Sequence, residues 1–261
     1  MDMNRRKLAN RELLKLRYQE REMETAARKT KQLPWKELLG KKIPEKAYSG
    51  LESAFCTGFS LVFQQGRKII EKTYKKEELR RSHALRDWKV KTAGSREDLK
   101  GMDRSAKKTD VLNKAATAAE GIALGALGVG LPDIVLFLST LLKGIYETAI
   151  HYGFDYESPQ EQYLILKMMS ASLKTGDPRV WENRSVDKLL EGELPQISQE
   201  QFRQQIHKTA SDFAMDMLVL KFIQGMPVVG FLGGAANPIY YQKVMGYIQL
   251  KYKKRYLLKQ L

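Results

Sequence analysis

The feature that most constrains this fold is an uncharged, glycine-rich run over residues 121–142, interrupted by a single carboxylate, Asp133. The run is about as long as one bilayer-spanning helix, which needs roughly 20 apolar residues. A charged side chain near the centre of such a helix costs about 2.5 to 3.5 kcal/mol by insertion scales. Pro132, directly before the carboxylate, also lacks the amide hydrogen that a continuous helix would use. The run therefore does not favour one uninterrupted transmembrane helix.

A break between two short apolar helices fits the same residues better. Gly130 and Pro132 are residue types that end one helix and begin the next. The sequence predicts one helix over roughly residues 107–129 and a second over roughly 133–152. Asp133 would then lie in the first turn of the second helix, where the helix dipole favours a carboxylate.

Glycines at helical spacing mark two segments that we expect to pack together. Small residues four positions apart let helix backbones approach closely, in bilayers and in tight soluble cores alike. The predicted helical hairpin is formed by Gly121, Gly125, Gly128, Gly130 and Pro132 in the first segment and by Pro227, Gly230 and Gly233 in the second. Whether its outer face meets lipid or protein stays open from the pattern alone.

Helical periodicity extends over most of the remaining chain. Apolar residues recur at intervals of three and four over residues 51–70 and 198–223. Ser198 followed by Gln201 fits a capping box at the start of the second of these stretches. No alternating run of strand length is present. The sequence therefore predicts an all-α fold, a multi-helix bundle around the glycine-rich apolar hairpin.

The positive charge of the chain is concentrated in its N-terminal half. The net charge is +15, and residues 1–110 carry 29 Lys and Arg against 16 Asp and Glu. We expect a basic, partly detached N-terminal helix over residues 1–32 and a single helical domain over residues 33–261. Within that domain, the basic stretch at about 72–108 is predicted to be a linker or a flexible arm.

A second basic patch lies near the C-terminal end, where tyrosines interleave with Lys251, Lys253 and Lys254. This mixture is typical of a surface that binds anionic lipid. Nucleic acid could accept the same charges, but no recognised reading module is present, and we do not expect it as a partner. With one cysteine and no apolar leader, the chain is expected in the cytoplasm, at the inner face of the cell membrane.

Two carboxylates interrupt apolar sequence and are candidate functional groups for that reason. Glu120 and Asp133 would each be costly to bury without a partner. Lys221 and Arg255 are the first candidate partners. A buried pair would fix the hairpin, whereas a carboxylate without a partner would suit a proton, ion or substrate site. Both alternatives stay open.

A histidine with a carboxylate four residues away on either side forms a second candidate site. Glu147, His151 and Asp155 would share one face of an uninterrupted helix, where carboxylates orient a histidine and raise its pKa. Gly153 threatens to end that helix first. His151 and Gly153 together fit an ordinary helix C-terminus, and we favour this capping interpretation over catalysis.

Common enzyme signatures are absent from the sequence. It contains no phosphate-binding loop, no zinc-binding helix, no nucleophile elbow and no paired cysteines. His83 is expected to be solvated, His207 to be a packed or surface residue, and Cys56 to be a small buried apolar group. We therefore expect no metal and no cofactor, and an accessory protein in preference to an enzyme.

Several segments resemble the EcsC family. They are AAEG (118–121), IHYGFDYESPQEQYLILKMM (150–169), PVVGFLGGAAN (227–237) and KKRYLL (253–258). The most specific signature combines the run Tyr152-Gly153-Phe154-Asp155 with a proline at 159 and with Glu161. The resemblance covers about residues 34–258. Where the family often has Glu-Arg, this chain has Glu161-Gln162, so no role is carried over to an arginine at that position.

The resemblance implies a membrane-associated helical accessory protein linked to a bacterial ABC transporter and to secretion. Its partners would be an anionic membrane surface and an ABC transporter or another membrane protein. The family's biochemical activity is not established, so the resemblance implies no reaction. Two alternatives remain: a cytoplasmic hydrolase-like enzyme that uses buried carboxylates, and a nucleic-acid-binding protein that uses residues 67–108.

Overall fold

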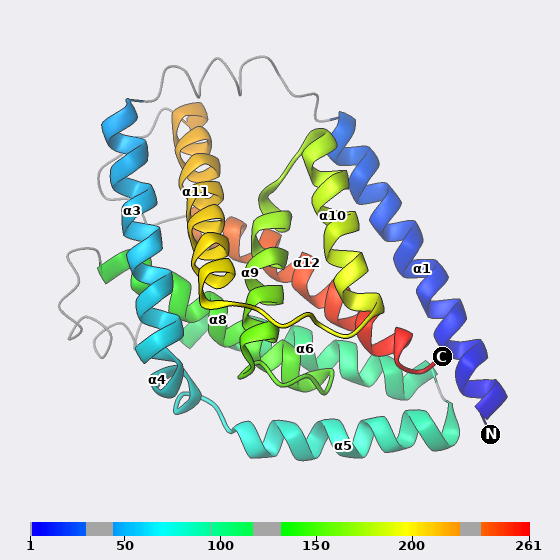
Figure 1. Ribbon diagram of the computed structural model, residues 1–261. Helices are drawn as coiled ribbons and strands as arrows, with labels where there is room; N and C mark the ends of the chain where they lie inside the picture. The colour runs from blue at the N-terminus through cyan, green and yellow to red at the C-terminus, as the bar shows by residue number, and fades with distance from the viewer. Residues whose placement is uncertain (1, 30–43, 95, 117–131, 225–235) are drawn as a thin grey trace.

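The computed structural model describes residues 2–29, 44–94, 96–116, 132–224 and 236–261, and all regular structure in these ranges is helical. The predicted all-α, multi-helix fold is therefore confirmed (Figure 1). The described α-helices are α1 (Asp2–Lys29), α3 (Glu45–Leu61), α4 (Arg67–Glu71), α5 (Lys76–Ala93), α6 (Arg96–Ala116), α8 (Pro132–His151), α9 (Pro159–Leu173), α10 (Gly176–Glu191), α11 (Gln199–Gln224) and α12 (Ala236–Leu258). A π-helical turn, η1 (Val62–Gly66), joins α3 to α4.

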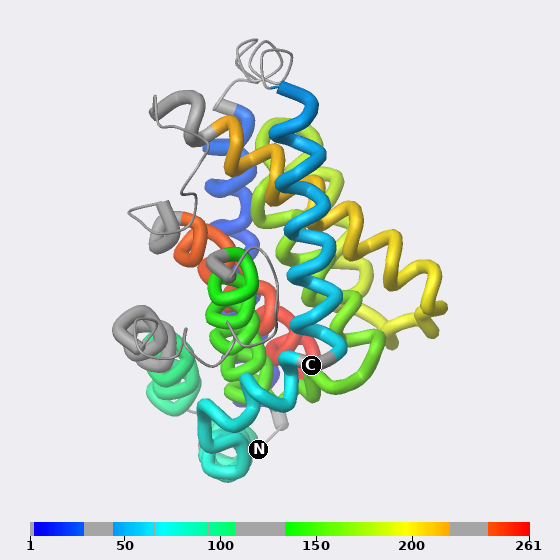
Figure 2. The backbone as a smooth tube through the Cα atoms, turned by 90° about the vertical axis from the view of Figure 1, so that its left-hand side faces the viewer, coloured from blue at the N-terminus to red at the C-terminus, as the bar shows by residue number. Residues whose placement is uncertain are grey.

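Helix α8 is the central helix of the molecule. It begins at Pro132 with Asp133 in its first turn, as predicted, and it contacts α3, α5, α6 and α12. Figure 2 shows it running through the middle of the bundle. The stretch Ile134–His151 is long and apolar enough to cross a membrane, but 89% of it is buried inside the protein. Other helices therefore cover this apolar surface.

An aromatic cluster packs α3 against α11 beside the central helix. The ring of Phe213 on α11 lies 5.5 Å from that of Phe55 and 5.7 Å from that of Phe59, centroid to centroid. The ring centroid of Phe137 of α8 lies 6.2 Å from that of Phe213. Each ring buries a large apolar area and adds an edge or tilted ring contact. In both stretches, the apolar residues that recur at the predicted helical spacing thus lie on the buried face of the helix.

The N-terminal helix is docked and not detached. Helix α1 runs along one edge of the molecule against α10 and α12 (Figure 1). Its inner face buries Ala9, Leu13 and Leu16, each less than 5% exposed. The prediction of a partly detached helix was wrong because these three apolar side chains, set among many charges, are enough to define a buried face.

The basic stretch at 72–108 is also part of the fold. It forms α5 and the first half of α6, which contact each other and α8. Val90, Leu99 and Met102 are buried there. Gly94 turns the chain between the two helices at a φ of +61°, a conformation that suits glycine. The expected linker or flexible arm is therefore two packed helices, with Val90, Leu99 and Met102 on their buried faces and Leu85 and Trp88 exposed on α5.

Much of the predicted glycine-rich hairpin lies outside the described residues. This applies to Glu120, Gly121, Gly125, Gly128, Gly130, Pro227, Gly230 and Gly233. Pro132 and Asp133 lie in α8 and Lys221 lies in α11, but only their backbone is described. The packing of the two glycine segments, and the pairing of Glu120 or Asp133 with a cation, stay predictions.

Candidate functional site

The basic tail does not form the surface predicted for it. Lys251 and Lys254 lie on α12 and are 0% and 5% exposed. Helix α12 contacts α1, α6, α8, α9 and α10, so most of its circumference faces protein. The sequence shows which residues of α12 are charged. Whether these residues are buried depends on helices that are distant in the sequence.

Lys251 and Lys254 belong to a four-residue ionic network that joins three helices. Lys251 Nζ lies 2.5 Å from Glu20 Oε1 of α1 and 2.5 Å from Asp187 Oδ1 of α10. Lys254 Nζ lies 2.7 Å and 3.0 Å from the second oxygens of the same two carboxylates. Buried charges need such partners. Burial lowers the pKa of Lys251 despite both carboxylates. For Lys254, burial is opposed by the hydrogen bonds and charges of Glu20 and Asp187, which together outweigh it and raise the pKa.

Lys253, on the same helix α12, pairs with carboxylates of other helices. Its Nζ lies 2.6 Å from Asp103 Oδ2 of α6 and 3.6 Å from Glu12 Oε2 of α1. The Tyr152 hydroxyl donates a hydrogen bond of 2.9 Å to the other oxygen of Asp103. All three lysines predicted as a membrane surface are thus held by ion pairs inside the protein.

Arg255 and Glu161 form a buried pair between α12 and α9. Arg255 Nη1 donates to both oxygens of Glu161, at 2.8 and 2.7 Å, and the Tyr252 hydroxyl donates to Glu161 Oε1 at 2.9 Å. Glu161 is 3% exposed and Arg255 8%. We predicted Glu120 or Asp133 as the partner of Arg255, and the partner described is Glu161. Glu161 and Arg255 were each singled out from the sequence. Their pairing was not predicted, because they lie 94 positions apart and no local sequence pattern links them.

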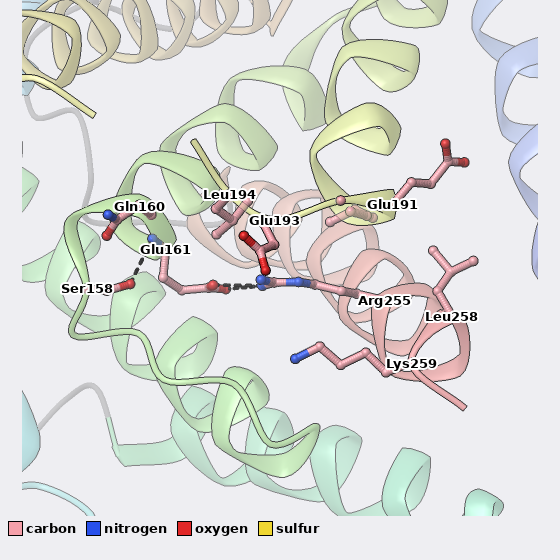
Figure 3. A pocket seen from close by; sticks show the side chains of 11 residues that line it. Ser158, Gln160, Glu161, Glu191, Glu193, Leu194, Arg255, Leu258 and Lys259 are labelled. Carbon is pink, nitrogen blue, oxygen red and sulfur yellow. Dashed lines mark hydrogen bonds and ion pairs between the residues drawn. The ribbon is translucent and has the colours of Figure 1, made fainter. Parts of the chain in front are cut away.

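The pair forms one wall of a pocket of about 560 Å³ (Figure 3). The pocket lies where the start of α9, the segment after α10 and the end of α12 meet. Phe154 lies beside the pocket. The centroid of its ring is 4.2 Å from the Arg255 guanidinium and 4.5 Å from the Lys259 ammonium. The segments that carry Phe154, Glu161 and Arg255 are among those that resemble the EcsC family, so the resemblance converges on this place. The lining residues are Ser158, Gln160, Glu161, Leu190, Glu191, Gly192, Glu193, Leu194, Arg255, Leu258 and Lys259.

A sharp turn between α8 and α9 places Glu161 in this pocket. Ser158 caps α9, because its hydroxyl accepts a 3.2 Å hydrogen bond from the Glu161 amide, and Pro159 begins the helix. Asp155 is exposed, and its Oδ1 accepts a 3.1 Å hydrogen bond from the Glu157 amide within the turn.

The predicted Glu147, His151 and Asp155 face does not form, because α8 ends at His151. Gly153 has a φ of +78°, its amide donates to the Ile150 carbonyl, and the Phe154 amide donates to the Ala149 carbonyl at 2.9 Å. These two bonds are those of a glycine-capped helix end. The capping interpretation is confirmed.

His83 reinforces this cap and is not solvated as we expected. Its Nδ1–H donates a 2.9 Å hydrogen bond to the carbonyl oxygen of His151. A methyl group on Gly153 would lie 2.3 Å from His83 Nε2, so only glycine fits beneath the ring. Burial, followed by the charge of Arg86 and by His83, lowers the pKa of His151 to about 4. His151 is therefore neutral at physiological pH, when it would be a poor proton donor.

The described residues offer little support for thiol or metal chemistry. Cys56 Sγ lies 3.3 Å from His207 Nδ1, but burial, aided by Glu52, raises the pKa of the thiol. A protonated thiol is a weak nucleophile. No group of three or more His, Cys, Asp or Glu residues able to hold a metal ion occurs in the part of the chain that the structure describes.

A basic and apolar surface that sequence reasoning missed lies on the outer side of α1. We call it the α1 stripe; its residues follow one another at intervals of three or four and are all exposed: Met3, Lys7, Arg11, Leu14, Tyr18 and Arg21. One exposed carboxylate, Glu22, borders the stripe and accepts a hydrogen bond from the Tyr18 hydroxyl. Helix α5 carries a shorter set of the same kind, Arg81, Leu85 and Trp88. The spacing is visible in the sequence, but which face of α1 is outside depends on α10 and α12.

Comparison with known proteins agrees with the resemblance found in the sequence. A family model described as the EcsC protein family matches residues 7–257. The chain is also 32% identical over 135 residues to Protein EcsC of Bacillus subtilis (strain 168), and that match covers 51% of this chain and 54% of that protein. The match thus spans about half the length of this curated relative. No solved structure matches the fold.

Proposed function

Because this chain belongs to the EcsC protein family, we propose that it is a peripheral, membrane-associated accessory protein. In this proposal it binds the anionic inner face of the cell membrane from the cytoplasm. It acts there beside a membrane partner, for which an ABC transporter is the candidate that the family resemblance implies. The proposal concerns location and partner and assigns no reaction.

The α1 stripe is the observation that carries this proposal. Its cations alternate with Met3, Leu14 and Tyr18, which are 68%, 64% and 64% exposed. Basic residues attract anionic headgroups, and amphipathic aromatic and aliphatic side chains insert at the level of the headgroups. A soluble protein has little reason to expose such residues together along one helix.

The strength of the attraction fits reversible binding. Each Lys or Arg near an anionic surface contributes about 1 kcal/mol, so Lys7, Arg11 and Arg21 together contribute about 3 kcal/mol. Insertion of Leu14 and Tyr18 adds to this. The α5 residues Leu85 and Trp88 supply a second point of contact of the same chemistry. Because α8 is buried in the protein core, the proposal requires no transmembrane helix.

Vesicle co-sedimentation tests the proposal. We expect the purified protein to sediment with vesicles that contain phosphatidylglycerol, to remain in solution with pure phosphatidylcholine, and to be released by high salt. The variant Lys7→Gln/Arg11→Gln should lose most of this binding. The matched control is Arg184→Gln/Lys188→Gln, which removes the same two charges from exposed positions of α10.

Three outcomes would count against the proposal. They are equal binding to both kinds of vesicle, an equal loss in the two variants, and no sedimentation at all. Retention on nucleic acid without vesicle binding would instead favour the nucleic-acid alternative.

A further inference from the structure

The pocket beside the Glu161–Arg255 pair is lined by one ammonium, Lys259, and two carboxylates, Glu191 and Glu193, for which the structure describes no ionic partner. Glu161 and Arg255 neutralise each other. Lys259 follows the end of α12 and Glu193 follows the end of α10, and both line the pocket. Among the described residues neither makes an ion pair. Because Glu191 turns away from the Glu161–Arg255 pair, the charges without an ionic partner that lie beside the pair are the Lys259 ammonium and the Glu193 carboxylate.

The two free charges lie on different sides of Arg255. In Figure 3 the Glu193 side chain turns toward the Glu161–Arg255 pair from one side, and Lys259 extends past the pair on the other. Glu191, although it lines the same pocket, turns away from the pair. The pocket is thus polarised, with an acidic end at Glu193 and a basic end at Lys259.

The basic end is prepared to receive an acid group. Lys259 lies over the Phe154 ring beside Arg255, and burial, followed by the charge of Arg255, lowers the pKa of Lys259. An acid group bound there would stabilise the ammonium form and reverse that shift. Arg255 uses only Nη1 for Glu161, so its remaining donors add to the basic end.

The remaining lining gives the pocket an apolar side. Leu190, Leu194 and Leu258 line it, and its volume of about 560 Å³ falls in the range typical of small-molecule sites. A ligand with two opposite charges and a small apolar group would contact every part of this lining.

We propose that this pocket binds a small zwitterion, with its acid group at Lys259 and Arg255 and its ammonium group at Glu193. The charges beside the Glu161–Arg255 pair decide between ligand classes: a simple anion would meet Glu193, and a simple cation would meet Lys259, whereas a zwitterion satisfies both. Two sources share this chemistry, a free amino acid with an apolar side chain and the ethanolamine phosphate headgroup of a lipid. The proposal does not depend on membrane binding through the α1 stripe.

Calorimetric titration with a matched set of probes tests the proposal. The probes are L-leucine, which carries both charges, N-acetyl-L-leucine, which keeps only the acid, and L-leucinamide, which keeps only the ammonium. We expect leucine to bind about fivefold more tightly than either analogue, which is the size expected for one partly exposed ion pair. Ethanolamine phosphate, measured alongside, distinguishes the sources: tighter binding than leucine assigns the site to a lipid headgroup, and weaker binding to a free amino acid.

Two variants assign the ends of the ligand. Lys259→Met should weaken leucine about fivefold and leave leucinamide unchanged, whereas Glu193→Gln should weaken leucine and leave N-acetyl-leucine unchanged. Lys188→Met, at an exposed position of α10 outside the pocket, is the matched control and should change nothing. Circular dichroism confirms that each variant is folded. Equal affinity for the three leucine probes, no saturable binding of any zwitterion, or unchanged binding in Lys259→Met would overturn the proposal.

Discussion

Glu161 is the most deeply buried carboxylate among the residues whose burial the structure describes. It is nearly fully buried and receives hydrogen bonds from Arg255 and Tyr252. The benefit of such a pair lies in the mutual neutralisation of two charges that are both out of water. Removing one partner therefore harms the fold more than removing both.

The Arg255→Met variant should lower the free energy of unfolding by about 3 to 5 kcal/mol, because it leaves Glu161 buried and charged. Glu161→Leu should lower the free energy of unfolding by a similar amount, because it leaves Arg255 buried without its carboxylate partner. The double variant should lose much less than the sum of the two, since neither charge remains. Urea denaturation followed by circular dichroism measures all three values. Losses that simply add would show that the two side chains are not coupled.

His151 should make the stability of the protein depend on pH. Its pKa is about 4 in the folded protein, where burial disfavours the charged ring, against an ordinary value of 6.5. Between these values the unfolded chain binds a proton that the folded protein refuses, so the free energy of unfolding falls as the pH decreases from 6.5 to about 4. The loss over that window is about 3 kcal/mol. Urea denaturation at a series of pH values measures it, and a His151→Gln variant, which cannot titrate, should show a flatter profile. An unchanged slope in that variant would assign the pH dependence elsewhere.

At the scale of the helix, α1 combines two opposite faces with different roles. Its inner face carries few apolar side chains, and its carboxylates Glu12 and Glu20 pair with basic residues of α12. Its outer face is the α1 stripe. Docking of α1 thus relies heavily on buried ion pairs, which are sensitive to the loss of a single partner.

The Glu20→Gln variant should loosen α1 selectively. Lys251 and Lys254 would then share a single carboxylate, that of Asp187, so one of the two ammonium charges would no longer be neutralised. Hydrogen exchange should become faster along α1 and the facing part of α12, whereas α3 and α11, which pack through phenylalanine rings, should keep their protection. The matched control is Glu22→Gln at an exposed position of the same helix. Uniform acceleration across all helices would argue against a local docking role.

Sequence reasoning succeeded for elements that are set by local chemistry. The start of α8 at Pro132 follows from the lack of an amide hydrogen, and its end at His151 follows from the positive φ of Gly153 two residues later. The capping box at Ser198 is also formed: its hydroxyl accepts from the Gln201 amide and its own amide donates to the Gln201 side chain. Each of these features depends on residues a few positions apart.

Sequence reasoning failed where a side chain's surroundings come from distant helices. The charges of α12 were read as exposed because composition carries no information on what covers a helix. The partner of Arg255 could not be identified because Glu161 lies on another helix, and several carboxylates were equally plausible by composition. His83 was taken as solvated because it is surrounded in sequence by charged residues, whereas in space it lies against Gly153.

At the scale of the whole molecule, the net charge of +15 is divided between two kinds of position. The lysines of α12 are neutralised inside the protein, and the cations of the α1 stripe face outward. Exposed cations such as Arg184, Lys188 and Lys259 lie elsewhere, but the excess of positive over negative charge is concentrated in the N-terminal half. A membrane contact, if it follows this distribution, would orient the molecule with α1 toward the lipid.

The ionic network around Lys251 also has a consequence for synthesis. Glu20 is separated from Lys251 by 231 positions. At a translation rate of 5 to 20 residues per second, about 10 to 50 s pass between the appearance of the two residues. During that interval the emerging α1 has no cationic partner from α12 and presents its carboxylates and its apolar side chains to solvent together. Helix α1 is thus made long before it is fully secured, and a nascent chain stalled before α12 would expose it to proteases and chaperones.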